Sequence, residues 1–202
     1  MKWVMPFVIV AVLLTDTVQG QIKQGTWEFS MSGNFGSSSG STEQSGAISF
    51  KTDQPAEGYL SLAFRPGFYV IEGLVVEPEL LWTALEGAPP SLSLMANAAY
   101  HFEVPQSRMV PFVLAGYGWA NGIPRLQVLQ HSTDGFDVTA WNIGAGIKYF
   151  LSLRVAVRAE YRFQRYSYET TSSLGAGLGN LTNTISTRRV FHNFFFGFSI
   201  FL

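Results

Sequence analysis

Hydrophobic and polar residues alternate strictly over Leu153–Gln164, LRVAVRAEYRFQ. The odd positions are apolar and end in aromatic residues, whereas the even positions carry three arginines, one glutamate, one glutamine and one small alanine. A period of two places alternate side chains on opposite faces of a β-strand. We therefore interpret the segment as one strand of a membrane-spanning barrel, with lipid on the odd face and a packed polar interior on the even face.

The same period recurs in seven further segments, so that eight strands are predicted in all. The other seven segments are 25–35, 58–70, 74–83, 91–102, 109–120, 136–150 and 188–202. Tight turns alternate with longer polar connections at 36–58, 84–90, 121–135 and 170–186. Short turns on one side and long external loops on the other are typical of outer-membrane barrels. The predicted fold is all-β: a closed antiparallel up-and-down transmembrane barrel of eight strands with a packed polar lumen.

Two features depart from regular strands. Gly36–Ser45 is polar and of low complexity, which predicts a solvated loop. Pro66 and Pro78 fall inside predicted strands, where proline removes a donor from the hydrogen-bonded ladder. We expect a β-bulge at each of these two prolines.

The polar faces of the predicted strands collect four acidic and five basic residues. They are Glu28, Arg65, Glu77, Glu79, Lys148, Arg154, Arg158, Glu160 and Arg162. An eight-stranded barrel is too narrow for an open channel, so side chains fill it, and an unpaired buried charge is costly. We expect Glu77 and Glu79 to contact Arg154, Arg158 or Arg162. A structural role for these charges is favoured over a gated pore or a proton-linked site.

Aromatic residues gather near the ends of the predicted strands, where rings occupy the membrane–water interface of a barrel. The predicted interface residues are Trp27, Trp82, Tyr100, Trp119, Trp141, Tyr149 and Phe150.

The N-terminal residues 1–20 are predicted to be a cleaved secretory signal peptide, followed by a barrel domain over 21–202. Lys2 precedes an apolar core, and Val18-Gln19-Gly20 suits cleavage before Gln21. The net charge of −1 and the 13% of charged residues argue against a nucleic-acid partner. The absence of cysteine excludes a disulfide scaffold and a thiolate metal site.

The three histidines, His101, His131 and His192, are the candidates for catalysis or metal binding. His131 lies near Ser132 and Asp134, but adjacent side chains on an extended segment point apart. The histidines are too far apart in sequence to suggest a metal site. We predict no catalytic residue, no metal and no cofactor, and an outer-membrane lipid hydrolase or acyltransferase stays open as an alternative.

The last nine residues, FFFGFSIFL, resemble the terminal strand of outer-membrane β-barrels, which carries a signal for the barrel-assembly machinery. Gly197, Ile200 and Leu202 match the spacing of that signal. The family favours an aromatic residue where Leu202 stands and a polar residue where Phe195 stands. With GTWEFS at 25–30 and PFVLAGYG at 111–118, the chain resembles small OmpA/OmpX-like barrel domains.

This resemblance implies an integral outer-membrane protein of a Gram-negative-type envelope, with both termini in the periplasm. It implies the lipid bilayer and lipopolysaccharide as partners, and the assembly machinery during biogenesis. The expected role is structural or surface-interacting through the external loops, not that of an open porin, with no external ligand specified. A soluble lipocalin-like carrier is the alternative fold, because Gly25-Thr26-Trp27 resembles the lipocalin GxW signature. That alternative requires apolar residues inside the barrel.

Overall fold

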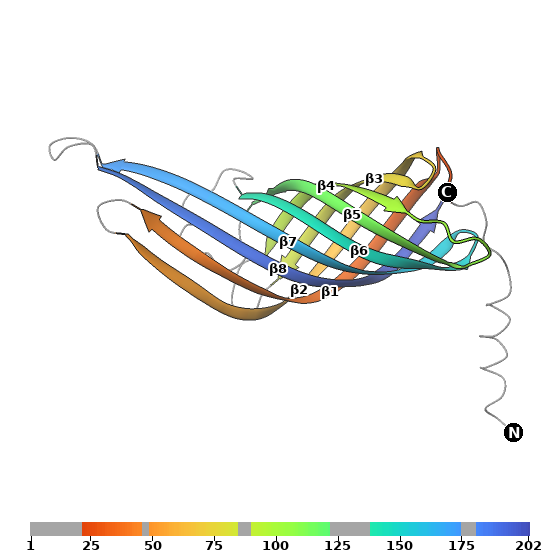
Figure 1. Ribbon diagram of the computed structural model, residues 1–202, viewed down its shortest axis with the longest axis horizontal. Coiled ribbons are helices and arrows are strands. Elements are labelled where there is room, and N and C mark those ends of the chain that lie inside the picture. The colour runs from red at the N-terminus through yellow and green to blue at the C-terminus, as the bar shows by residue number, and fades with distance from the viewer. Residues whose placement is uncertain (1–21, 46–48, 85–89, 122–137, 175–180) are drawn as a thin grey trace, which may run out of the picture.

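The computed structural model describes residues 22–45, 49–84, 90–121, 138–174 and 181–202, so the predicted signal peptide lies outside the described residues and stays a prediction. Eight antiparallel strands form one closed barrel in which β8 pairs with β1 (Figure 1). The strands are β1 (Trp27–Ser45), β2 (Phe50–Ile71), β3 (Leu74–Ala84), β4 (Ser91–His101), β5 (Met109–Ala120), β6 (Val138–Ser152), β7 (Val155–Leu174) and β8 (Leu181–Phe201). Among the described residues, no helix is long and apolar enough to cross a membrane.

The barrel closes with a large stagger between its strands. A path of paired residues that leaves β1 at Met31 and passes through every strand returns to β1 at Ser41, ten residues further on. For eight strands, such a stagger corresponds to a strand tilt of roughly 40°. A barrel of this size has an interior that side chains can fill completely.

The two faces of the wall have the chemistry of a membrane protein. On β8, Phe194, Phe196 and Phe198 point outward and are 47%, 54% and 43% exposed, whereas Asn193 and Ser199 point inward and are buried. The other strands alternate in the same way, with apolar side chains outside and polar ones inside. The predicted fold class is confirmed. A lipocalin-like carrier would have the two faces reversed, so that alternative is wrong.

The predicted loops at one end of the barrel are largely strand. Gly36–Ser45 is the second half of β1, and it pairs with β8 over its whole length. The connection predicted at 170–186 is also shorter, because β7 continues to Leu174 and β8 begins at Leu181. Beyond the membrane neither face of a strand meets lipid, so both faces are polar. The hydrophobic alternation therefore ends while the backbone pairing continues.

Four strands are much longer than their neighbours. β1, β2, β7 and β8 have 19, 22, 20 and 21 residues, whereas β3, β4 and β5 have 11, 11 and 12. The long strands continue past the rim of the barrel as a sheet in the order β7-β8-β1-β2 (Figure 1). We call residues 36–45, 50–59, 168–174 and 181–187 the projecting sheet. The opposite end, with its short connections between β2 and β3, β4 and β5, and β6 and β7, is the turn end.

The two strand prolines lie opposite each other instead of forming bulges. β2 and β3 pair up to Phe64–Leu80 and again from Phe68–Val76 without any change of register. Pro66 and Pro78 occupy the interval between these pairs, where the ladder is interrupted. The bulge prediction is therefore wrong. Because neither proline has an N–H to donate, placing one against the other confines the missing hydrogen bonds to a single gap.

Close approach of two strands explains one glycine of the last strand. A Cβ at Gly197 would lie 2.0 Å from the Met31 carbonyl oxygen, whereas a Cβ at Gly33 would lie 3.7 Å from its nearest atom, on Leu62. We expect Gly197→Ala to lower the free energy of unfolding by about 1–3 kcal/mol, and Gly33→Ala to change it by less than about 0.5 kcal/mol. Urea unfolding in detergent micelles, followed by tryptophan fluorescence, measures both. Equal effects of the two variants would contradict the close approach.

Candidate functional site

Eight of the nine predicted lumen charges face the barrel interior, and all eight are buried. The exception is Arg154, which lies exposed in the turn between β6 and β7, so its placement in the lumen is wrong. The alternation of Leu153–Gln164 hides this turn. Leu153 and Arg154 belong to the turn, but they have the same apolar–polar order as the residues of β7, which begins at Val155.

The group of charges nearer the turn end contains two acids and two bases. Lys148 Nζ lies 2.6 Å from Glu28 Oε2, and the Tyr69 hydroxyl donates to the same oxygen at 2.9 Å. Arg158 donates from Nη1 and Nη2 to the two carboxylate oxygens of Glu77, at 2.7 and 3.0 Å. Such a two-point pairing fixes the geometry of the guanidinium as well as its charge.

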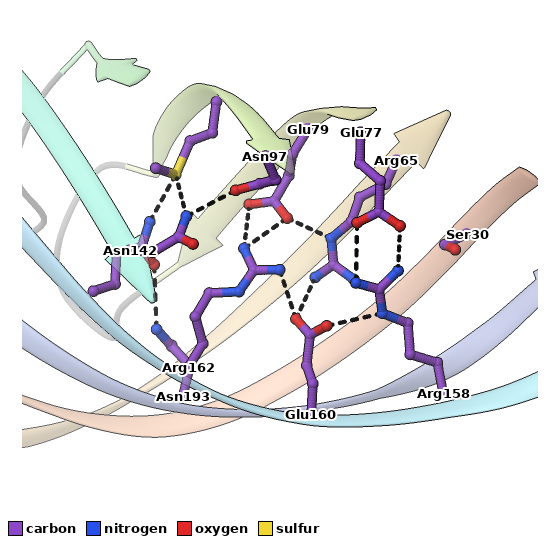
Figure 2. A network of polar contacts seen from close by, with 12 residues as sticks. Ser30, Arg65, Glu77, Glu79, Asn97, Asn142, Arg158, Glu160, Arg162 and Asn193 are labelled. Atoms are coloured by element: carbon purple, nitrogen blue, oxygen red, sulfur yellow. Dashed lines mark hydrogen bonds and ion pairs between the residues drawn. The ribbon is translucent and has the colours of Figure 1, made fainter. Parts of the chain in front are cut away.

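The second group lies next to the first, further from the turn end, and also contains two acids and two bases. Arg162 donates to Glu79 at 2.8 Å and to Glu160 at 2.6 Å (Figure 2). Arg65 contacts the same two carboxylates, Glu79 through Nε and Glu160 through Nη2. Arg158 Nε lies 2.8 Å from Glu160 and joins the two groups. These four acids and four bases therefore form one electrically balanced network.

Two ion pairs of the network cross the lumen. Glu77 and Glu79 lie on β3, and their partners Arg158 and Arg162 lie on β7, as the sequence predicts. In the closed strand order, three strands separate β3 from β7 on either side, so the two are opposite walls of the barrel. Ion pairs between opposite walls occupy the full width of the interior. These ion pairs therefore bridge the lumen from wall to wall at this level.

Aromatic rings cover the guanidinium groups where hydrogen-bond partners are missing. The Cζ atoms of Arg65 and Arg162 each lie 4.9 Å from the centre of the Phe195 ring, and Arg158 lies 4.7 Å from that of Phe112. Arg65 Nη1 and Arg162 Nε have no hydrogen-bond partner among the described residues. A ring face attracts a buried cation and compensates in part for such a missing partner. Sequence reasoning missed this role of Phe195, although its position between the outward Phe194 and Phe196 is the signal.

Above the ion network, toward the projecting sheet, amide side chains line the interior, and Arg189 on β8 is also buried on this inner face. Asn142 donates to Asn97 at 2.9 Å, and Asn193 donates to Gln164 at 3.2 Å (Figure 2). A cluster of rings follows. Phe191 lies 5.1 Å from Tyr59 and 5.0 Å from Tyr166, measured between ring centres. Along the described interior, the charge network is therefore followed by amides and then by aromatic rings.

The predicted interface aromatics occupy the outer face with one exception. Trp27, Trp82, Tyr100, Trp119 and Trp141 are exposed on the barrel exterior, and Tyr149 is partly exposed.

Phe150 is wrongly predicted, because it is buried inside the barrel, with its ring centre 5.1 Å from that of Phe201. Its neighbour Lys148 is two residues away and also points inward, so alternation determines the face of Phe150 more strongly than its aromatic character.

Of the three predicted assembly-signal positions, Ile200 and Leu202 are exposed outside, and Gly197 lies on the inner face. Their part in assembly stays a prediction.

The histidines do not form a common site in the described part of the chain. His101 is buried in the lumen between the rings of Tyr69 and Phe112, at 5.5 and 5.2 Å between ring centres. His192 is exposed on the barrel exterior, and His131 lies outside the described residues. The described residues also contain no cluster of three or more side chains suited to metal binding. The prediction that the chain is not an enzyme stays a prediction.

Comparison with known proteins gives matches at the level of family and fold. A family described as "Outer membrane protein beta-barrel domain" matches residues 8–190. The crystal structure of the outer membrane protein OprG from Pseudomonas aeruginosa matches with 12% sequence identity and a TM-score of 0.54. This match covers 92% of the present chain and 99% of the OprG chain. The crystal structure of Neisserial surface protein A matches with 16% sequence identity and a TM-score of 0.48. This match covers 83% of the present chain and 96% of the Neisserial chain. The search of curated proteins found no match.

Removing one acid from the network should be costly. We expect Glu77→Ala to leave Arg158 without its two-point partner and to lower the free energy of unfolding by roughly 3–5 kcal/mol. The matched control is Glu43→Ala, because Glu43 pairs with Lys51 at 3.5 Å but both side chains are exposed. Its cost should be about 0–1 kcal/mol. Thermal melting in detergent micelles compares the two, and similar losses would contradict a stabilising lumen network.

Proposed function

Because the chain belongs to the outer membrane protein beta-barrel domain family, we propose that it is a surface-interaction protein whose projecting sheet binds an extended segment of another polypeptide. In this proposal the turn end and Leu202 lie in the periplasm, and the projecting sheet lies outside the cell. Outer-membrane barrels carry their short turns on the periplasmic side, which supports this orientation. The observation that carries the proposal is the length of β1, β2, β7 and β8 beyond the rim.

The projecting sheet has two edges without a neighbouring strand in the described part of the chain. β2 pairs with β3 only from Leu60 onward, and β7 pairs with β6 only up to Ser167. Beyond these residues, each edge presents backbone N–H and C=O groups that a further strand could pair with. Addition of an extended peptide to such an edge is a common mode of recognition.

The two edges differ in how well they suit a partner strand. The free part of β2 contains Lys51, Asp53 and Pro55, and charged residues and proline are typical of edges that are protected from pairing. The free part of β7, 168–174, contains no proline and only one charged residue, Glu169. We therefore assign the partner strand to the edge of β7.

The filled interior supports a binding role over a diffusion role. The ion pairs between β3 and β7 take up the width of the lumen, and Phe191 and Tyr166 pack against Tyr59 at the base of the projecting sheet. The proposal contains no catalytic step, since His101 lies inside the barrel and His192 outside it.

A peptide selection tests the proposed function. Random twelve-residue peptides displayed on phage are selected against the protein in lipid nanodiscs, and the selected peptides are then measured against variants. We expect selected peptides with alternating β-branched residues, and a loss of affinity of about tenfold or more for Thr170→Lys/Ser172→Lys, since lysine on an edge discourages pairing. Lys51→Thr on β2 is the control and should bind as the wild type does. Failure to select any peptide, or equal binding to the β7 variant, would contradict the proposal.

A further inference from the structure

The projecting sheet is an open half-barrel. Its strands β7, β8, β1 and β2 are consecutive in the closed order and make up half of the barrel wall (Figure 1). The other half stops lower, where β3 and β5 end at Ala84 and Ala120 and where β4 and β6 begin at Ser91 and Val138. Above this rim, one half of the cylinder therefore continues without the other, and its β7 and β2 edges are both open in the described part of the chain.

A strand that is added to either edge has to arrive from outside. β6 occupies the β7 edge up to the pair of Thr139 and Ser167, and β3 occupies the β2 edge up to the pair of Ala84 and Leu60. An added strand is therefore in line with β6 or β3 and must end above it. A neighbouring barrel in the same membrane would have to pass its strand through this occupied position, whereas a barrel in a facing membrane would not.

The direction of the strands leads to the same requirement for a second copy of this chain. Two identical strands pair through the same edge in the antiparallel sense, about a two-fold axis perpendicular to them. All copies of β7 in one membrane run from the turn end outward, so they are not antiparallel to one another. A copy in a facing membrane runs in the opposite direction and meets the requirement.

We propose that the projecting sheet binds the projecting sheet of a second copy of this chain in a facing membrane, so that two half-barrels complete one closed cylinder. β7 pairs with β7 of the partner and β2 pairs with β2 of the partner, about a single two-fold axis. Closure of a barrel leaves no open edge. The inference rests on the proposed function, because it identifies the extended segment that the β7 edge binds.

One axis can serve both seams only if it crosses β7 and β2 at the same level. The free part of β7, residues 168–174, has Thr171 at its centre. The stagger of ten residues over eight strands displaces paired residues from a common level by about 1.25 residues per strand. With this displacement, the level of Thr171 passes through β8 and β1 and falls between Thr52 and Asp53 on β2. Both seams are therefore compatible with one axis.

The charges of the β2 edge are complementary to themselves about this axis. With Thr52 on the axis, Lys51 lies opposite the partner's Asp53, and Asp53 lies opposite the partner's Lys51. All three residues are exposed, and opposite charges on facing positions of an antiparallel pair are favourable. Lys51 also lies 3.5 Å from Glu43 of its own chain, so the lysine has an acid on both sides. An edge whose charges exclude a foreign strand therefore accepts a second copy.

The remaining residues of the two edges also permit the seams. β2 begins at Phe50, so a seam centred on Thr52 includes residues 50–54 and leaves Pro55 outside. On β7, Glu169 is the one charged residue of the free part, and it lies away from the axis, so it does not face the same residue of the partner.

Sedimentation of nanodiscs that each hold one barrel tests the pairing, because two copies can then meet only by face-to-face stacking of two discs. We expect wild-type discs to sediment as pairs. Asp53→Lys places like charges opposite each other in both copies and should weaken the pairing about tenfold. The matched control is Lys51→Asp/Asp53→Lys, which exchanges the two charges, restores their complementarity and should pair as the wild type does.

Cysteine cross-linking locates the axis. The chain has no cysteine, so Thr171→Cys and Thr52→Cys each introduce a single thiol. A residue on the axis faces its own copy at roughly 4.5–5.5 Å between Cα atoms, which a disulfide can bridge. We expect both variants to form disulfide-linked dimers on oxidation with copper phenanthroline. Ser45→Cys, at an exposed position on the inner strand β1 of the sheet, is the control and should stay monomeric.

Three results would overturn the inference. They are wild-type discs that sediment singly, Asp53→Lys discs that pair as tightly as the charge-exchanged control, and cross-linking at position 171 that is no stronger than at position 45. A shift in gel mobility on boiling establishes that each variant is folded. Peptide binding to the β7 edge without pairing of discs would overturn this inference and leave the proposed function standing, whereas the absence of both would overturn both.

Discussion

The ion pairs that join β3 to β7 across the lumen are the interaction on which the rest of the barrel depends. Glu77 and Glu79 reach Arg158 and Arg162 from the opposite wall, and each acid of the network has at least one basic partner. The outer face must be apolar because it meets lipid, so the polar residues have to be inside, where an unpaired charge would be costly. Glycines of β6 make this possible. Gly144 and Gly146 face Arg162 and Glu160 where a larger side chain would collide with the neighbouring strand.

The same network also supports the barrel wall where the hydrogen-bonded ladder between β2 and β3 is interrupted. The ladder between β2 and β3 is interrupted around Pro66 and Pro78, and Arg65 and Glu79 lie on these strands beside the gap. Their buried ion pair connects the two strands from the inner side of the wall. It lies next to the positions at which the backbone hydrogen bonds between the strands are missing. The lumen charges therefore also help to hold adjacent strands of the barrel wall together.

Period-two alternation was sufficient to predict the membrane-spanning part of all eight strands and most of the lumen charges, because lipid and lumen impose opposite chemistry on the two faces. It failed where that contrast is absent. Gly36–Ser45 is strand although both of its faces are polar, and Arg154 continues the alternation from within a turn. Phe150 shows that aromatic character alone does not assign a face.

A dry, charge-filled interior and a lipid-facing exterior are tested most directly by spin-label accessibility along β8. The chain has no cysteine, so single cysteines at positions 193–196, 198 and 199 can each carry one nitroxide label in lipid vesicles. We predict that oxygen dissolved in the lipid reaches the labels at 194, 196 and 198. Neither oxygen nor a water-soluble nickel complex should reach those at 193, 195 and 199. Access of the nickel complex to the odd positions would show a water-filled lumen and would contradict the account.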